Sequence, residues 1–413
     1  MNKEIIKSFI WDLREIVYKT RFSIYAYYSH VKHKVKGGNF QNRFSKRFSI
    51  DKLKEIIITN KKKRVAIFVA FHEKDKIPES NKEYIEFLKN CSFNIIYLHN
   101  GKLQEKVIFD LESLGCYVVC RKNIGQDFGA WKDMILILEQ YKLINKIDWL
   151  LLCNDSNFYL GGENGEYFKR RFLDKLENDH NKDFISLNIN YELMVHHQSY
   201  FLCLSKKIIN GDSFKLFWKK YLPLNLRPHA INKGEKKLTS KVLNKFTPCI
   251  MFTSSDLYKE IIDSMEDNSN QNIFLQLLPK TCFYLNSCID RGIVNQYGVQ
   301  KIIHVLENYN QSHSLALLLN IYCKSPFLKK DVIRHGTYSI SQIEYFICNK
   351  SLINNELLIN EIKLHCRRSG TPFSFWDIPK EAARKGISRF GQTYSLWSDS
   401  QLYIRKFISD SDS

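Results

Sequence analysis

The sequence lacks the features that mark membrane, secreted and disulfide-bonded proteins. No uncharged apolar run of about 18 residues occurs in its 413 residues, so we expect no membrane-spanning helix. The first residues, MNKEIIK, have neither the apolar core nor the small-residue cleavage site of a signal peptide. The 11 cysteines form no C-x-x-C pair, which is typical of free thiols in a reducing compartment. Together these absences predict a cytoplasmic globular protein.

Several catalytic and binding motifs are absent as well. The glycine-rich loop at 161–165 is not followed by Gly-Lys-Ser/Thr, which excludes a P-loop. No H-E-x-x-H motif occurs, and His196 and His197 would point to opposite faces of a strand, so they cannot bind one zinc ion together. No RNA-binding signature is present. The Ser, His and Asp residues also show no order typical of a nucleophilic catalytic triad. These absences disfavour a P-loop, a zinc site and nucleophilic catalysis.

Positive charge is concentrated at the beginning of the chain. The net charge is +19, and residues 1–64 contain 17 Lys and Arg against 5 Asp and Glu. Such a segment fits a solvated basic face, docking on an anionic membrane surface, or nucleic-acid binding. Apolar residues between 4 and 24 follow one helical face, typical of an interfacial helix or of a helix packed on its own domain. Residues 29–64 are predicted to be a linker or weakly structured arm.

From residue 64 onward, short apolar runs alternate with helical patterns. Four runs are typical of parallel strands covered on both faces, at 64–71, 93–98, 116–120 and 149–153. This alternation predicts an α/β protein with a mostly parallel sheet flanked by helices. Beyond about residue 300 the pattern is helical. We therefore predict a basic N-terminal helix and linker over 1–63, an α/β domain over 64–300 and a C-terminal helical appendix over 301–413.

The best single candidate for a site is the carboxylate that follows the run 149–153. Ligands bind at the carboxyl ends of parallel strands, and Asp155 stands there between Asn154 and Ser156. A carboxylate in this place can hold a divalent cation that bridges a diphosphate, with Asn154 or Ser156 orienting the ligand. The alternative is that these residues only turn the chain or cap the next helix. The pattern alone favours neither.

Two other segments carry candidate residues. In the loop NIGQDFG at 123–129, Gly125 permits close backbone approach to a ligand, and Asp127 can bind a sugar or ribose hydroxyl or be the N-cap of the next helix. Glu235 stands at a predicted helix start, where it complements the helix dipole or serves as a general base near an acceptor hydroxyl. One of His196 and His197 is expected to reach a site, and the other to be structural.

Three motifs in order carry a resemblance: 123–131 (NIGQDFGAW), 151–156 (LLCNDS) and 196–201 (HHQSYF). Together they resemble the rhamnan synthesis protein F family of bacterial polysaccharide glycosyltransferases. The segments at 217–218, 234–239 and 324–330 are similar to later family features, so the likeness spans about residues 64–330. The resemblance implies a GT-A-like fold, peripheral attachment to the anionic inner face of the cytoplasmic membrane, and sugar transfer from a nucleotide sugar to a polysaccharide or lipid-linked glycan.

The resemblance also implies a role for each candidate residue. Donor binding, with a dTDP-sugar such as a deoxyhexose, falls to Asn123, Gly125, Asp127, Asn154, Asp155 and Ser156. Asp155 takes the metal- and diphosphate-binding role, with Mg²⁺ or Mn²⁺, although Cys153 stands where a second aspartate would be. Glu235 or His196 would be the base in an inverting reaction. The acceptor side would be His197, Gln198 and Tyr200.

Two other classes of protein remain as alternatives. The +19 charge fits a non-catalytic nucleic-acid- or membrane-binding protein. Its basic residues, however, precede the α/β core and are not interleaved with aromatics, so we expect no specific nucleic acid. A metal-dependent phosphotransferase on the same sheet is the other alternative. Transfer of phosphate without incorporation of sugar would distinguish it.

Overall fold

The computed structural model describes most of the chain between residues 40 and 369. The described residues are 13, 16–17, 20, 23–31, 40–59, 61–179, 181–191, 194–265, 273–279, 296–334, 337–338, 340–347 and 352–369. Most of the helix predicted over 4–24 and the last part of the predicted C-terminal region lie outside this set. Within it, no helix combines the length and the apolar character needed to span a bilayer.

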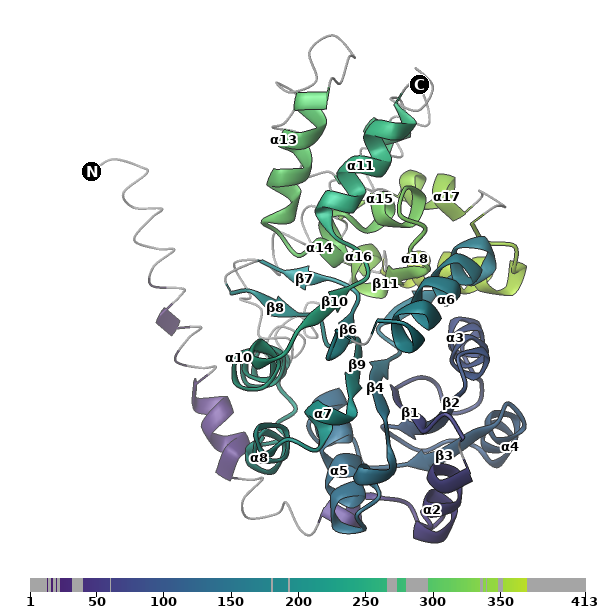
Figure 1. Ribbon diagram of the computed structural model, residues 1–413, viewed down its shortest axis with the longest axis vertical. Helices are drawn as coiled ribbons and strands as arrows, with labels where there is room; N and C mark the ends of the chain where they lie inside the picture. Colours follow the sequence, from purple (N-terminus) through teal and green to yellow (C-terminus); the bar gives the residue numbers. More distant parts are fainter. Residues whose placement is uncertain are drawn as a thin grey trace.

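A seven-stranded sheet forms the centre of the molecule, in the order β10-β6-β9-β4-β1-β2-β3 (Figure 1). The strands are β1 (Arg64–Ala70), β2 (Phe93–His99), β3 (Cys116–Cys120), β4 (Trp149–Asn154), β6 (Phe184–Ser186), β9 (Phe201–Ser205) and β10 (Pro248–Ile250). β1 pairs in parallel with β2 and β4, whereas β9 pairs antiparallel with both β4 and β6. The predicted mostly parallel α/β sheet flanked by helices is confirmed.

Alternation along β1 explains why the sheet is covered on both faces. Val65, Ile67 and Val69 belong to one hydrophobic cluster, whereas Ala66 and Phe68 belong to the other. Successive side chains of a strand point to opposite faces, so a fully apolar strand needs two covers. The helices on the first face are α2 (Ile50–Thr59), α5 (Gln126–Gln140), α7 (Lys206–Ile209), α8 (Asp212–Lys220) and α10 (Lys236–Lys241).

The second face is covered by helices from both ends of the described chain. They are α3 (Glu79–Asn90), α4 (Glu105–Ser113), α6 (Gly162–Glu177), α11 (Ser254–Ser264), α13 (Gln296–Glu307), α15 (Ala316–Ile321), α16 (Lys330–Arg334), α17 (Ile340–Ile347) and α18 (Glu356–Ser369). Figure 1 shows α5, α7 and α8 on one side of the sheet and α3 and α6 on the other. The helices beyond residue 296 thus share one core with the sheet.

The connections create a switch point beside β1. The chain runs outward from β1 to β2 and β3, and then returns to the other side of β1 to form β4. Where the strand order reverses in this way, the loops at the carboxyl ends of the two neighbouring strands diverge and leave a crevice. The crevice at the ends of β1 and β4 is therefore the place where the fold favours a ligand.

Two segments differ from the sequence-based predictions. Residues 29–64 were predicted to be a linker or weak arm, but α2 lies within them and buries Leu53 and Ile57. The apolar spacing of this helix was hidden by its lysines. In the predicted C-terminal appendix, β11 (Phe327–Lys329) pairs antiparallel with β5 (Asn157–Tyr159), directly after the Asp155 turn. The domain boundaries at 63 and 300 stay predictions.

Candidate functional site

The predicted strand-end carboxylate lies at the switch point. Asp155 follows the last residue of β4, and its Oδ2 accepts a hydrogen bond from the backbone N–H of Phe71 at 2.9 Å, just after β1. Its own N–H donates to the carbonyl oxygen of Val69 at 3.1 Å. Asp155 therefore ties the ends of β1 and β4 together, while its Oδ1 accepts no hydrogen bond from the described residues.

Asn154 joins the two loops that the sequence singled out. Its Nδ2 donates to Asp127 Oδ2 at 2.7 Å, and its Oδ1 accepts from the N–H and hydroxyl of Ser156 at 3.1 and 2.7 Å. The side chain of Asn154 is buried, so these three hydrogen bonds are largely shielded from water. The turn role, one of the two alternatives, is observed in the bonds to Ser156, whereas the ligand-orienting role stays a prediction.

The loop before α5 is built on Gly125. Gly125 has φ +80° and is the N-cap of α5, and a Cβ on it would lie 2.7 Å from Pro223 Cα. Asn225 accepts a hydrogen bond from the Gly125 N–H and donates to the carbonyl of Asn123 at 3.1 Å. Asp127 lies in the first turn of α5 and is not its N-cap, because the left-handed backbone that begins the helix requires glycine at 125.

Three buried charged residues, Arg43, Arg121 and Asp133, form an ion triad that holds this loop in place. Asp133 of α5 accepts from Arg121 at 2.7 Å and from Arg43 at 2.8 Å. Arg121 also donates to the carbonyl of Ile124 at 3.0 Å. No sequence pattern indicated this triad, since Arg43 lies 90 residues from Asp133. Its effect is to hold the backbone of residues 121–124 against α5.

The carboxyl group of Asp127 has a strongly raised pKa. Burial raises the pKa of its carboxyl to about 7, and the negative charge of Asp155 adds to the shift. The hydrogen bond from Asn154 and the positive charge of Lys329 act in the opposite direction. Glu235 also raises this pKa, so three carboxylates and one ammonium group interact within one region.

The stability of the Asp127→Asn variant relative to the wild type is expected to increase as the pH rises. The folded wild type keeps a proton on Asp127 up to about pH 7, whereas an unfolded aspartate loses it near pH 4. The free energy of unfolding of the wild type therefore falls as pH rises through this window. Between pH 5 and pH 8 the advantage of the variant should grow by about 1–3 kcal/mol.

Denaturant unfolding of both proteins across this range measures the gap. Asp110→Asn, which changes an exposed aspartate of α4, is the matched control and should show no pH-dependent gap. A constant gap for Asp127→Asn would show that this carboxyl titrates as an ordinary aspartate.

Glu235 lies at the end of a π-helical segment, η3 (Ala230–Glu235), directly before α10. Its Oε1 accepts hydrogen bonds from the hydroxyl and, at 3.3 Å, the backbone N–H of Ser199. Its Oε2 lies 3.8 Å from His196 Nε2, and His196 Nδ1 bonds to the carbonyl of Met194 at 2.7 Å. Gly234 packs against the ring of Phe128, where a Cβ would approach to 2.9 Å. Glu235 is therefore held with one oxygen fixed and the other beside an imidazole.

The remaining predicted acceptor-side residues are buried. His197 bonds to Ser186 Oγ at 2.8 Å on the other side of its strand, β8 (His196–His197), and burial lowers its pKa to about 4. Gln198 donates its N–H to the carbonyl of Asn188 at 3.3 Å. Tyr200 donates to Asn188 Oδ1 at 2.8 Å. His197 is thus placed away from Glu235, whereas Tyr200 presents its ring toward Lys329.

Several residues at the same edge escaped the sequence-based prediction. Lys329 Nζ lies 4.3 Å from the ring centroid of Tyr200. At the ends of β1 and β2, the rings of His72 and His99 are 4.7 Å apart, and Phe71, with 61% of its surface exposed, stacks on His99. Their position directly after two apolar strands was a usable signal. The segment 324–330 was noted only as similar to a later family feature, and no role at the site was predicted for Lys329.

The described side chains do not form a protein metal centre. They contain no group of three or more His, Cys, Asp and Glu residues placed to hold one ion. Asp155 has one oxygen engaged by Phe71, and the Asp127 carboxyl is largely protonated below about pH 7. The role of Asp155 in holding Mg²⁺ or Mn²⁺ stays a prediction.

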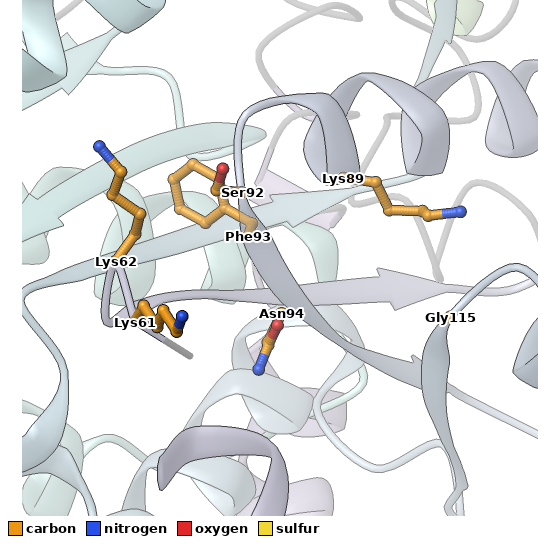
Figure 2. A pocket seen from close by; sticks show the side chains of 7 residues that line it. All are labelled: Lys61, Lys62, Lys89, Ser92, Phe93, Asn94 and Gly115. Atoms are coloured by element: carbon orange, nitrogen blue, oxygen red, sulfur yellow. The ribbon is translucent and has the colours of Figure 1, made fainter. Parts of the chain in front are cut away.

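Two surface hollows lie away from this edge. One, of about 350 Å³, is lined by Tyr167, Arg170, Arg171 and Asp174 of α6. The other, of about 390 Å³, lies at the amino ends of the strands and is lined by Lys61, Lys62, Lys89, Ser92, Phe93, Asn94 and Gly115 (Figure 2). Neither contains a residue of the carboxyl edge, which stays the candidate site on the strength of its topology and contacts.

Comparison with known proteins agrees with the resemblance drawn from the sequence. Residues 95–275 match the model of the family described as Rhamnan synthesis protein F. A segment of 176 residues is 26% identical to "Uncharacterized protein y4gN" of Sinorhizobium fredii, and it covers 42% of this chain and 45% of that protein. The family match includes Asp127, Asp155 and Glu235, but it includes neither β1 nor β11.

Proposed function

We propose, from the match of residues 95–275 to the rhamnan synthesis protein F family, that the protein is a polysaccharide-synthesis enzyme, namely a glycosyltransferase. The observation that carries the proposal is the gathering of Asp127, Asp155 and Glu235 at the carboxyl edge beside β1. Asn154, next to Asp155, bonds to Asp127, and Gly234, next to Glu235, packs on the ring of Phe128, next to Asp127. Carboxylates accept hydrogen bonds from sugar hydroxyls. A GT-A-like arrangement is part of the proposal, supported by the mostly parallel sheet and its switch point.

The donor is a nucleotide sugar, with a dTDP-deoxyhexose as the expected class. Asp127 and Asp155 accept hydrogen bonds from the sugar. Asn154, which precedes Asp155 and bonds to Asp127, fixes the position of one carboxylate relative to the other. The exposed ring of Phe71, stacked on His99, offers a flat surface for the base at the end of β1. Each contact comes from a strand end or from the first turn of α5, so the framework is rigid.

The reaction is proposed to be an inverting transfer with Glu235 as the general base. Ser199 fixes one carboxylate oxygen, which leaves Oε2 to take the proton of an acceptor hydroxyl. His196 lies 3.8 Å from Oε2 and, when protonated, stabilises the ionised carboxylate. The acceptor is a lipid-linked or polysaccharide glycan, and the basic first 64 residues are proposed to hold the enzyme at an anionic membrane surface.

The proposal is tested with a panel of nucleotide sugars and the variant Asp155→Asn. One donor should raise the melting temperature of the wild type, and the variant should lose about tenfold or more in donor affinity, because an amide replaces a hydrogen-bonded carboxylate. Asp148→Asn, at the opposite end of β4, removes only a surface ion pair with Lys206 and should bind normally.

Three results separate this function from its alternatives. Full sugar transfer by Asp155→Asn would refute the site. Phosphate transfer without sugar incorporation would indicate a phosphotransferase. Tight, salt-sensitive binding of nucleic acid without binding of any nucleotide sugar would indicate a nucleic-acid-binding protein.

A further inference from the structure

Lys329 is brought to the site by a strand from the far end of the described chain. It is the last residue of β11 and pairs with Asn157 of β5. The N–H of the next residue, Lys330, donates to the carbonyl of Ser156 at 3.0 Å. Because Ser156 and Asn157 directly follow Asp155, this pairing fixes the backbone of Lys329 beside the strand-end turn.

The ammonium group of Lys329 has an unusual environment. It lies 4.3 Å from the ring centroid of Tyr200, and the charges of Glu235, Asp331 and Asp127 all act on it. Burial lowers the pKa of Lys329, and these carboxylates oppose that shift. Within the described part of the chain, no carboxylate lies within ion-pair distance of Nζ. Lys329 is half-buried, and an ammonium group that is partly removed from water without a bonded anion is costly, a cost that a cation–π contact offsets only in part.

The proposed donor carries negative charge into a region that is already acidic. Its diphosphate would lie near Asp155, and near Asp127 once that carboxyl ionises above about pH 7, and like charges in a place of low polarity repel strongly. A carboxylate such as Asp155 can hold a diphosphate only through an intervening cation. A positive side chain of the protein at the same edge would offset the negative charge of the diphosphate directly.

We propose that Lys329 binds the diphosphate of the donor and stabilises the charge that develops on it as the sugar is transferred. This inference rests on the proposed function. In the step, the acceptor oxygen forms a bond to the anomeric carbon, while the bond from that carbon to the phosphate oxygen breaks. The bonding pair passes to the nucleoside diphosphate, which leaves as the anion beside Lys329, and the hydroxyl proton passes to Glu235. Ammonium–phosphate contacts that strengthen during such a step lower its barrier.

The expected result concerns binding of dTDP and UDP, measured by calorimetry in buffer with EDTA. Lys329→Met keeps the apolar stem over Tyr200 but removes the charge, so it should weaken binding by about tenfold to a hundredfold. Lys329→Arg should restore most of the affinity. Lys324→Met is the matched control: Lys324 is exposed, and its Nζ lies 5.3 Å from the ring centroid of Tyr167, so the variant should bind as the wild type does.

Each other outcome has a definite meaning. Equal binding by Lys329→Met and wild type overturns the inference, as does wild-type binding that EDTA abolishes, because a metal ion then carries the charge. A wild type that binds no nucleoside diphosphate or nucleotide sugar, with or without Mg²⁺, overturns the proposed function itself. If Lys329→Met fails to fold, the inference is tested instead by measuring the acetylation of each lysine of the wild type with and without dTDP. dTDP should protect Lys329 but not Lys324, and equal acetylation of Lys329 with and without dTDP overturns the inference.

Discussion

Replacing Glu235 by Gln is expected to slow sugar transfer by about 10²–10⁴-fold. The amide cannot take the proton of the acceptor hydroxyl, but it keeps the shape of the side chain. Its oxygen can still accept the hydrogen bonds that Ser199 donates, so the end of η3 should keep its position. Donor affinity should change little, because Glu235 lies on the acceptor side of the proposed site.

This result is measured as kcat with the donor found in the panel, alongside donor affinity by calorimetry. Glu86→Gln is the control: it removes an exposed carboxylate of α3 that lies 3.7 Å from Lys89, and it should transfer at the wild-type rate. A Glu235→Gln enzyme with undiminished kcat would exclude Glu235 as the base. Asp127, whose pKa is about 7, would then be the next carboxylate to test.

Replacing Asp133 by Asn is expected to destabilise the folded protein by about 3–5 kcal/mol. Asp133 is fully buried between Arg121, also fully buried, and Arg43, with 7% exposed. Removing the Asp133 carboxylate takes away the ion-pair partner that both guanidinium groups share in an interior shielded from water. This cost is much larger than the loss of a surface ion pair, which is about 0–1 kcal/mol.

Denaturant unfolding monitored by circular dichroism measures this effect. Asp51→Asn provides the comparison, because Asp51 pairs with Lys54 at 3.1 Å while 92% of its side chain is exposed, and it should change the stability by less than about 1 kcal/mol. Equal stability of the two variants would mean that the triad contributes no more than a surface pair. Because Arg121 also holds the carbonyl of Ile124, donor affinity should fall together with stability.

The central strands and the loops at their ends were predictable from the sequence. The run RVAIFVA is buried at every position. A strand that is covered on both faces must be apolar almost throughout, so it can be recognised from its sequence alone. Because parallel strands end at one edge, the loops at 123–129 and 154–156 could be expected to meet there, and Asn154 does bond to Asp127. These predictions needed only local pattern and a general rule of sheet topology.

The parts that could not be predicted depend on distant contacts. Arg43 and Asp133 are 90 residues apart, and neither has a local pattern that announces a buried partner. The segment that contains Lys329 was noted only as similar to a later family feature, and it is the pairing of Lys329 with Asn157 that brings it beside the Asp155 turn. The helix α2 was missed because its lysines are typical of an exposed linker, although they leave an apolar stripe on one side of the helix.

The pairing of β11 with β5 has a consequence for the order in which the protein matures during synthesis. A nascent chain released as far as β10 holds all seven strands of the central sheet, and with them Asp127, Asp155 and Glu235. It does not yet hold Lys329, which the ribosome adds about 80 residues later. The acidic residues of the proposed site are thus made first and its proposed ammonium group last. Truncation before β11 should remove that ammonium group together with α16, α17 and α18, which share the core on the second face of the sheet.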